Sequence, residues 1–166
     1  MTLDPDLFRA VCGTFATGVT VVAAQGPNEP HGSTVNSFAS LSLCPPQIVV
    51  CLARSSRTWN AVEAAGAFAV NILAAGQRDV ARLFASGEPD KLSRVDWAPG
   101  QNGAPLLRGA AAQLECRLTG VFPQATHILL IGSVTHAAHR TDAHPLIFFR
   151  SRMHDGVGPA PAGTRP

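Results

Sequence analysis

Charged residues are scarce in this sequence, and those present do not gather into runs. They make up 14% of the chain, the formal net charge is +2, and Lys91 is the single lysine. Because no Lys/Arg cluster could follow a phosphate backbone, the sequence predicts no nucleic-acid partner. Hydrophobic residues make up 46% of the 166 residues, which excludes a disordered chain and predicts one compact domain with a buried core.

The sequence also lacks paired cysteines and long apolar runs. Cys12, Cys44, Cys51 and Cys116 are scattered and form no C-x-x-C motif. We therefore expect free thiols in a reducing compartment, and a cytoplasmic protein. No apolar stretch approaches the length of a membrane span, and the N-terminus has no signal-peptide core, so neither export nor a membrane partner is predicted.

Several catalytic and nucleotide-binding signatures are absent. The sequence contains neither G-x-G-x-x-G nor G-x-x-x-x-G-K-[ST], which argues against a doubly wound nucleotide-binding fold. It also lacks G-x-S-x-G, so a serine hydrolase is not indicated. His136, His139 and His144 lie near one another in the chain, but no cysteine or carboxylate stands at ligand spacing. No metal site is predicted.

Short apolar runs separated by turn residues dominate what is present. They predict strands and only a few short helices, as in an antiparallel β-barrel. Strands are expected at 18–24, from 34 onward, and at 46–53, 68–73, 112–122, 127–137 and 145–150, and helices at 6–13, 55–66 and 77–86. Residues 88–109 are rich in turn residues and predict an irregular excursion. The composition predicts a domain over residues 1–155 and a disordered tail over 156–166.

The stretch HGSTVNSFASLSLCPP, from His31 to Pro46, carries five hydroxyl groups and an amide but no acid, lysine or arginine. From Thr34 its even positions are mostly polar and its odd positions mostly apolar or small, the period-two alternation of a strand. A solvated strand usually carries charges here. The pattern therefore indicates a surface that contacts a polar, flat and weakly charged group. PQIVVCLA, which follows, is apolar throughout and predicts a strand covered on both faces.

The next segment, SSRTWNAVEAAG, predicts a helix whose first residues can hold an anion. Unpaired N–H groups at a helix N-terminus favour phosphate, and Ser55, Ser56, Arg57 and Thr58 add three hydroxyls and a guanidinium. Taken alone, these residues fit ordinary N-capping and a solvated arginine equally well. A phosphate-binding helix start one strand away from a hydroxyl-lined strand suits a ligand with a phosphate at one end and a polar-edged ring at the other. A flavin nucleotide has that shape.

The chain resembles a known family in eight segments that occur in the family's order and spacing. These are FRAVCGTFATGVTVVAA, HGSTVNSFASLSLCPPQIVVCL, SSRTWNAVEAAGAFAVNIL, ARLFA, GAPLL, AAQLECRL, THILLIGSV and PLIFFR. The sequence is similar to the short-chain flavin reductases, the NAD(P)H:flavin oxidoreductase components of two-component monooxygenases. The resemblance implies a mainly β fold, the Greek-key FMN-binding split barrel, in a homodimer with flavin near the subunit interface.

The resemblance also implies which residues bind FMN or FAD. Thr34, Val35, Asn36 and Ser37 would line the isoalloxazine, largely through backbone groups, with Ser40 and Ser42 near the ribityl chain or the ring edge. Cys51, Leu52 and Ala53 would flank the ribityl chain. Ser55, Ser56, Arg57, Thr58 and Lys91 would hold the phosphate.

The resemblance implies a catalytic position for His127, beside the flavin and the incoming nicotinamide of NADH or NADPH. The family's pattern here is Gly-Asp-His, whereas this chain has Ala125-Thr126-His127. The missing acid leaves the orientation of the imidazole open. Cys44 likewise replaces the family's usual Asp or Asn before the proline, which we interpret as a turn variation.

The resemblance implies an NAD(P)H-dependent flavin reductase that passes hydride from nicotinamide C4 to flavin N5 and supplies the reduced flavin to a partner monooxygenase. Two alternatives stay open. The first is a non-catalytic flavin-binding protein, and the second is an oxidoreductase that keeps its flavin as a prosthetic group.

Overall fold

The structure, a computed structural model, describes residues 3–156. The tail predicted to be disordered therefore lies outside the described residues, apart from Gly156, and its disorder stays a prediction. Strands dominate, as predicted. They are β1 (Thr17–Gly18), β2 (Thr20–Gln25), β3 (Pro30–Val35), β4 (Ala39–Leu43), β5 (Pro46–Ala53), β6 (Ala67–Ile72), β7 (Trp97–Pro99), β8 (Pro105–Leu107), β9 (Ala112–Gln124), β10 (His127–His139), β11 (Leu146–Phe149) and β12 (Arg152–Asp155).

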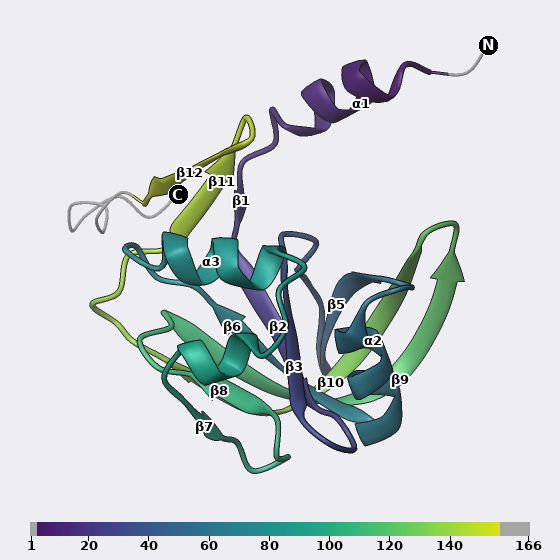
Figure 1. Cartoon of the computed structure of the whole chain (residues 1–166), viewed down its shortest axis with the longest axis vertical. Helices are drawn as coiled ribbons and strands as arrows, with labels where there is room; N and C mark the ends of the chain where they lie inside the picture. The colour runs from purple at the N-terminus through teal and green to yellow at the C-terminus, as the bar shows by residue number, and fades with distance from the viewer. Residues whose placement is uncertain (1–2, 157–166) are drawn as a thin grey trace.

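The body of the molecule is a curled antiparallel sheet of seven strands in the order β3-β2-β6-β9-β10-β5-β4 (Figure 1). Two small sheets, β1-β11-β12 and β7-β8, complete the fold. The core inside the curl is apolar, with Phe68, Val50, Val62 and Leu130 fully buried. The fold is a split β-barrel, which confirms the predicted class.

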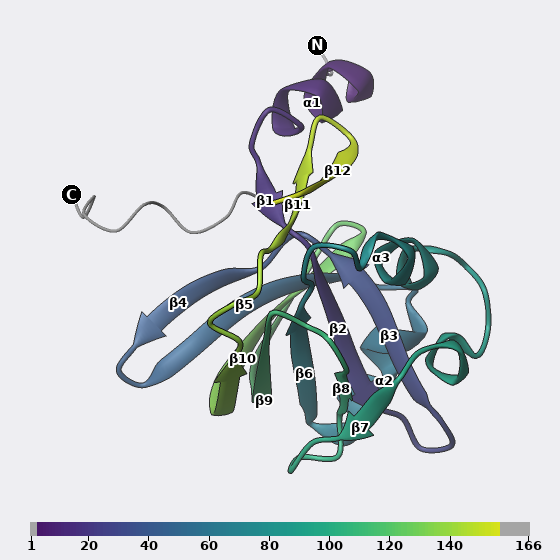
Figure 2. The same ribbon diagram turned by 90° about the vertical axis from the view of Figure 1, so that its left-hand side faces the viewer.

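Three helices and one short 3-10 turn accompany the strands. They are α1 (Pro5–Cys12), α2 (Arg57–Ala65), α3 (Arg78–Ala85) and η1 (Lys91–Arg94). Both views show α1 standing away from the barrel, whereas α2 and α3 pack against the sheet near β3 (Figure 2). None of the described helices is long and apolar enough to cross a membrane. The irregular stretch 88–109 contains η1, β7 and β8 joined by turns.

The expectation of one continuous strand from Thr34 onward is wrong. The chain forms β3 up to Val35, leaves the sheet over residues 36–38, and re-enters it as β4 at Ala39. Since β3 and β4 are the two edges of the seven-stranded sheet, this short link carries the chain across the seam where the barrel is split. Alternation within each short strand produced the pattern of one long strand, because a sequence period does not reveal a change of sheet edge.

The bounds of β5 agree with the prediction, but within residues 3–156 its second face is only partly covered. Its buried residues are Ile48, Val50 and Leu52, while Val49 and Cys51 on the other face are half-exposed. The opposite side of the sheet therefore presents a partly apolar surface outside the barrel core.

Candidate flavin-binding site

Helix α2 is capped at both ends. The Ser56 hydroxyl accepts a hydrogen bond from the N–H of Trp59 at 3.1 Å, and Gly66 ends the helix in the left-handed conformation. β5 delivers the chain to this point, because only Arg54, Ser55 and Ser56 separate Ala53 from the first helical residue. The predicted helix is confirmed, and the main-chain N–H groups of its first turn have no carbonyl partner within the helix.

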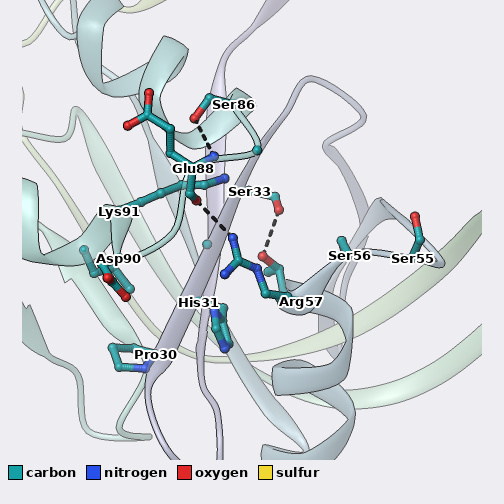
Figure 3. Close-up of a pocket in the computed structure, with 14 residues that line it drawn as sticks. Pro30, His31, Ser33, Ser55, Ser56, Arg57, Ser86, Glu88, Asp90 and Lys91 are labelled. Carbon is teal, nitrogen blue, oxygen red and sulfur yellow. Dashed lines mark hydrogen bonds between the residues drawn. The ribbon is translucent and has the colours of Figure 1, made fainter.

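A cavity of about 230 Å³ opens beside this helix start (Figure 3). Three segments line it: β3 near its beginning, the start of α2, and the loop that runs from α3 into η1. The lining residues are Pro30, His31, Gly32, Ser33, Ser55, Ser56, Arg57, Thr58, Ser86, Gly87, Glu88, Asp90, Lys91 and Leu92. All five residues predicted to hold a phosphate are therefore brought together in one cavity.

Two cations face this cavity from different elements. Arg57 extends from the start of α2, and its Nη2 donates to the carbonyl of Glu88 at 3.0 Å (Figure 3). Lys91 reaches in from η1, and its Nζ donates to the carbonyl of Phe84 at 3.0 Å. In residues 3–156 neither cation forms an ion pair, since the nearby Glu88 carboxylate is paired with Arg94.

Burial lowers the pKa of Lys91 and the positive charge of Arg57 lowers it further, while the Glu88 carboxylate opposes part of this shift. The ammonium is therefore in a place where its charge is poorly compensated. An anion placed between Lys91 and Arg57 would relieve both the desolvation and the repulsion. With the exposed Arg57, Lys91 gives the cavity two cationic groups that suit an anion.

Two of the predicted hydroxyl ligands are already engaged. Thr58 is buried, with 2% of its surface exposed, and its Oγ1 lies 2.8 Å from the Oγ of Ser33. The Ser56 oxygen serves as the N-cap acceptor. Ser55 is exposed and has no such partner among the described residues. Of the two neighbouring serines, Ser55 therefore has the hydroxyl that is free to turn toward a ligand.

The residues predicted to line a flavin ring lie outside this cavity, along β3 and the link that follows it. The Thr34 hydroxyl points to α3, where it donates to the carbonyl of Ala81 at 2.7 Å, and Val35 packs against the core. Asn36 and Ser37 are exposed and belong to neither strand. In the described part of the chain their main-chain groups make no hydrogen bond to another main chain.

The side chain of Ser37 has a structural role. Ala39 pairs with Val49, so Ser37 lies opposite Cys51 when the register is continued by two residues on each strand. Its Oγ accepts from the Cys51 N–H at 2.9 Å and donates to the Cys51 carbonyl at 3.1 Å. The hydroxyl thus replaces the missing ladder pair, and the main chain of Ser37 remains available to a ligand.

The remaining predicted residues lie on β4 and β5, on the far side of this link. Ser40 is exposed and Ser42 half-buried on the edge strand β4. On β5, Cys51 and Ala53 face the half-exposed side, whereas Leu52 is only 1% exposed and points into the core. Leu52 could therefore contact a ligand through its main chain alone.

His127 begins β10 directly after a two-residue hairpin turn, Ala125-Thr126. It pairs with Ala53, which places it at the end of β5 that leads into Ser55. Its Nδ1 lies 2.9 Å from the Oγ1 of Thr126. Thr126 therefore stands where the family has an acid, and its hydroxyl contacts the imidazole. This contact can orient the ring without a carboxylate.

Some lining residues were missed by sequence reasoning. Ser33 belongs to the hydroxyl-rich stretch but gave no sign of its contact with Thr58, which comes from a different element. His31, Glu88 and Asp90 come together only through the packing of β3 against the loop after α3. Within residues 3–156, no group of three or more His, Cys, Asp or Glu side chains could hold a metal ion.

Comparison with known proteins places the chain in a family. The model of the flavin reductase like domain matches residues 12–156, which is nearly the whole chain. The chain belongs to the flavin reductase family. The resemblance drawn from the eight sequence segments is therefore confirmed.

Individual members of the flavin reductase family match over most of their length. The reductase subunit HsaB of a flavin-dependent monooxygenase from Mycobacterium tuberculosis is 38% identical over 99% of this chain and 87% of its own. The FMN reductase (NADH) SmoA of Agrobacterium fabrum is 42% identical over 85% of this chain and 80% of its own. The solved structure of the NADH:FAD oxidoreductase SgcE6 of Streptomyces globisporus superposes with a TM-score of 0.87 at 37% identity, covering 95% of this chain and 98% of that one.

Proposed function

We propose that this protein is an NAD(P)H:flavin oxidoreductase that reduces FMN or FAD and supplies the reduced flavin to a partner monooxygenase. The observation that carries the proposal is the cavity with two unpaired cations at the start of α2, within a chain of the flavin reductase family. Relatives described as an FMN reductase and as an FAD oxidoreductase, both NADH-dependent, support this assignment.

The residues present fit a phosphorylated flavin. Arg57, Lys91, Ser55 and the first N–H groups of α2 supply donors and positive charge for a phosphate. Ser56 and Thr58 hold the helix start and the neighbouring strand in place, since their hydroxyls are engaged there. The lowered pKa of Lys91 supports this fit, because an apo site with uncompensated charge favours an anion.

The ring of the flavin would lie beyond the cavity, along the link between β3 and β4. Main-chain groups of Thr34, Val35, Asn36 and Ser37 would face its polar edge, Ser40 and Ser42 would lie beside it on the adjoining edge strand, and Cys51, Leu52 and Ala53 would flank the ribityl chain. Main-chain N–H groups there would stabilise the negative charge that reduction brings to the ring edge. Small hydroxyls and main chain bind modestly, which suits a flavin that must leave.

A bound flavin would supply the chemistry, as the acceptor at N5 of a hydride from C4 of the nicotinamide. The chain has to hold the two rings in contact and leave one ring face open. His127, which begins β10 beside the end of β5, is the side chain we propose to contact the incoming nicotinamide. Hydride transfer needs positioning rather than a carboxylate pair, so the absence of such a pair from the proposed site residues agrees with the reaction.

We also propose that the protein is a homodimer whose interface covers the apolar side chains outside the barrel. α1 buries none of its residues, and Leu7, Phe8 and Val11 on it are each more than half exposed. Leu43 on β4 is 92% exposed, and Phe122 near the end of β9 is also exposed. A second copy would bury these groups next to the proposed ring site. Sedimentation velocity measures the oligomeric state, and a monomer at micromolar concentration would remove this part of the proposal.

The four cysteines are free in the structure, which supports a reducing, cytoplasmic location. The proposed reaction is tested by following NADH and NADPH oxidation with FMN and with FAD in all four pairings. We expect turnover with free flavin in excess. A protein that binds flavin without oxidising either nicotinamide would be the non-catalytic binding protein. One that stays yellow through gel filtration and reduces no added flavin would keep its flavin as a prosthetic group.

A further inference from the structure

The turn that precedes His127 is hydrogen-bonded to Arg54, the residue that follows β5. The N–H of Arg54 donates to the carbonyl of Thr126 at 3.0 Å, and the guanidinium of Arg54 reaches the carbonyl of Ala125 at 3.5 Å. Both contacts come from the residue directly after β5. The main chain of Thr126 is therefore fixed relative to the end of β5 and the start of the phosphate-binding segment.

From this fixed position the Thr126 hydroxyl lies 2.9 Å from Nδ1 of His127. A hydroxyl can donate or accept, and a neutral imidazole has one nitrogen of each kind. In the described part of the chain, Nδ1 is the sole hydrogen-bond partner of this hydroxyl, and the ring tautomer decides which of the two atoms donates. If the hydroxyl donates to Nδ1, the proton of the neutral ring is placed on Nε2.

We propose that Thr126 is a positioning residue that fixes His127 in the Nε2–H form, so that the imidazole presents a neutral hydrogen-bond donor to the ligand. The inference rests on the proposed function, in which His127 contacts the nicotinamide. The carboxamide oxygen of the nicotinamide is an acceptor that this N–H suits. A carboxylate at position 126 can only accept, so it would draw the proton to Nδ1 and turn the outward nitrogen into an acceptor. Residue 126 thus decides whether the outward nitrogen of His127 is a hydrogen-bond donor or an acceptor.

The tautomer can be measured without flavin or nicotinamide. Long-range proton–nitrogen NMR correlation on ¹⁵N-labelled protein distinguishes the two neutral forms, and His127→Gln assigns the signals. At about pH 8.5, above the range in which histidine usually titrates, we expect Nε2–H in the wild type and in Thr126→Ser. Thr126→Val should give a mixture, and Thr126→Asp should give Nδ1–H. A wild type in the Nδ1–H form, or a Thr126→Val spectrum identical to it, would overturn the inference.

Kinetics supply the second readout. Losing one hydrogen bond that orients the ring should lower kcat/KM for the nicotinamide by about threefold to tenfold in Thr126→Val. Thr126→Ser, which keeps the hydroxyl, should stay within about twofold of the wild type, because a single retained bond is all that is required. Equal losses in both variants would indicate a merely structural role and overturn the inference.

The two proposals fail separately. If His127→Ala keeps full activity, His127 has no part in the reduction, and Thr126→Val is then not expected to lower kcat/KM. The ligand-free tautomer is measured independently of that result. If the tautomer is wrong while His127→Ala is impaired, the proposed function stands and the role of Thr126 is lost.

Discussion

The hydroxyl of Ser37 bridges the N–H and the carbonyl of Cys51, at 2.9 and 3.1 Å, and so closes the β4–β5 ladder where the main chain has left it. This contact holds the link between β3 and β4 beside β5 while leaving the main chain of Ser37 unpaired. A structural hydrogen bond and a free ligand-binding edge thus coexist at one residue.

Ser37→Ala should weaken both stability and flavin binding. The Cys51 N–H would lose its partner, which should lower the free energy of unfolding by about 1 kcal/mol and raise the Kd for FMN several-fold through a looser link. Urea denaturation and fluorescence titration measure the two effects. Ser40→Ala is the matched control for stability on the same edge, where a change within about 0.5 kcal/mol is expected. Equal losses in the free energy of unfolding of the two variants would contradict the role given to Ser37.

Arg57→Ala should separate phosphorylated from unphosphorylated flavin. A charge-assisted hydrogen bond contributes about 1.5–3 kcal/mol, so the Kd for FMN should rise by about tenfold to a hundredfold, while the Kd for riboflavin should hardly change. Arg82→Ala, which removes an exposed arginine outside the cavity, controls for net charge. An equal rise in the Kd for FMN and for riboflavin would show that Arg57 does not contact the phosphate.

The lowered pKa of Lys91 predicts two opposite pH dependences. Between its folded-state pKa and the ordinary value of 10.5, the unfolded chain holds the proton that the folded chain has released. The contribution of Lys91 to the free energy of unfolding of the apo protein therefore rises with pH across this window. FMN affinity falls across the same window, because the site loses a cation.

Both pH dependences are measurable by difference. Lys91 is the single lysine and tyrosine is absent, so the cysteine thiols are the main other groups that titrate near this window, and the wild type and Lys91→Arg share them. Lys91→Arg keeps its charge at these pH values and should show neither trend. FMN affinity in the wild type that stays constant up to pH 10.5 would contradict the prediction.

The four cysteines should react with iodoacetamide at different rates. Cys12 and Cys44 are exposed and should be alkylated first, whereas burial raises the pKa of Cys116 to about 12 and should protect it until the protein unfolds. Cys51 is half-exposed beside the proposed ring site. Bound FMN should therefore slow the alkylation of Cys51 and leave Cys12 and Cys44 unchanged. Mass spectrometry after timed quenching measures this, and a flavin-independent rate at Cys51 would place the ring elsewhere.

Ala125→Gly should stabilise the hairpin that carries His127. Ala125 has a φ of +46°, a left-handed conformation that glycine adopts without the steric cost that alanine bears. We expect a gain of about 0.5–1 kcal/mol in the free energy of unfolding. Gly66→Ala is the matched reverse change, at a φ of +63°, and should destabilise by about 1 kcal/mol. If Ala125→Gly lowers the free energy of unfolding as Gly66→Ala does, Ala125 carries no backbone strain that glycine relieves.

The local structure could be predicted from the sequence. The bounds of β5, the helix with Ser56 before it and Gly66 after it, and the mainly β architecture all followed from periodicity and capping, because neighbouring residues decide them. The eight family segments identified the flavin reductases. The tertiary structure decided the rest. It split the hydroxyl-rich stretch between two sheet edges, gave the Ser37 hydroxyl to Cys51, and joined Lys91, Arg57 and Ser33 around one cavity. These contacts join residues far apart in the chain, and their partners depend on how the barrel closes, which no local pattern encodes.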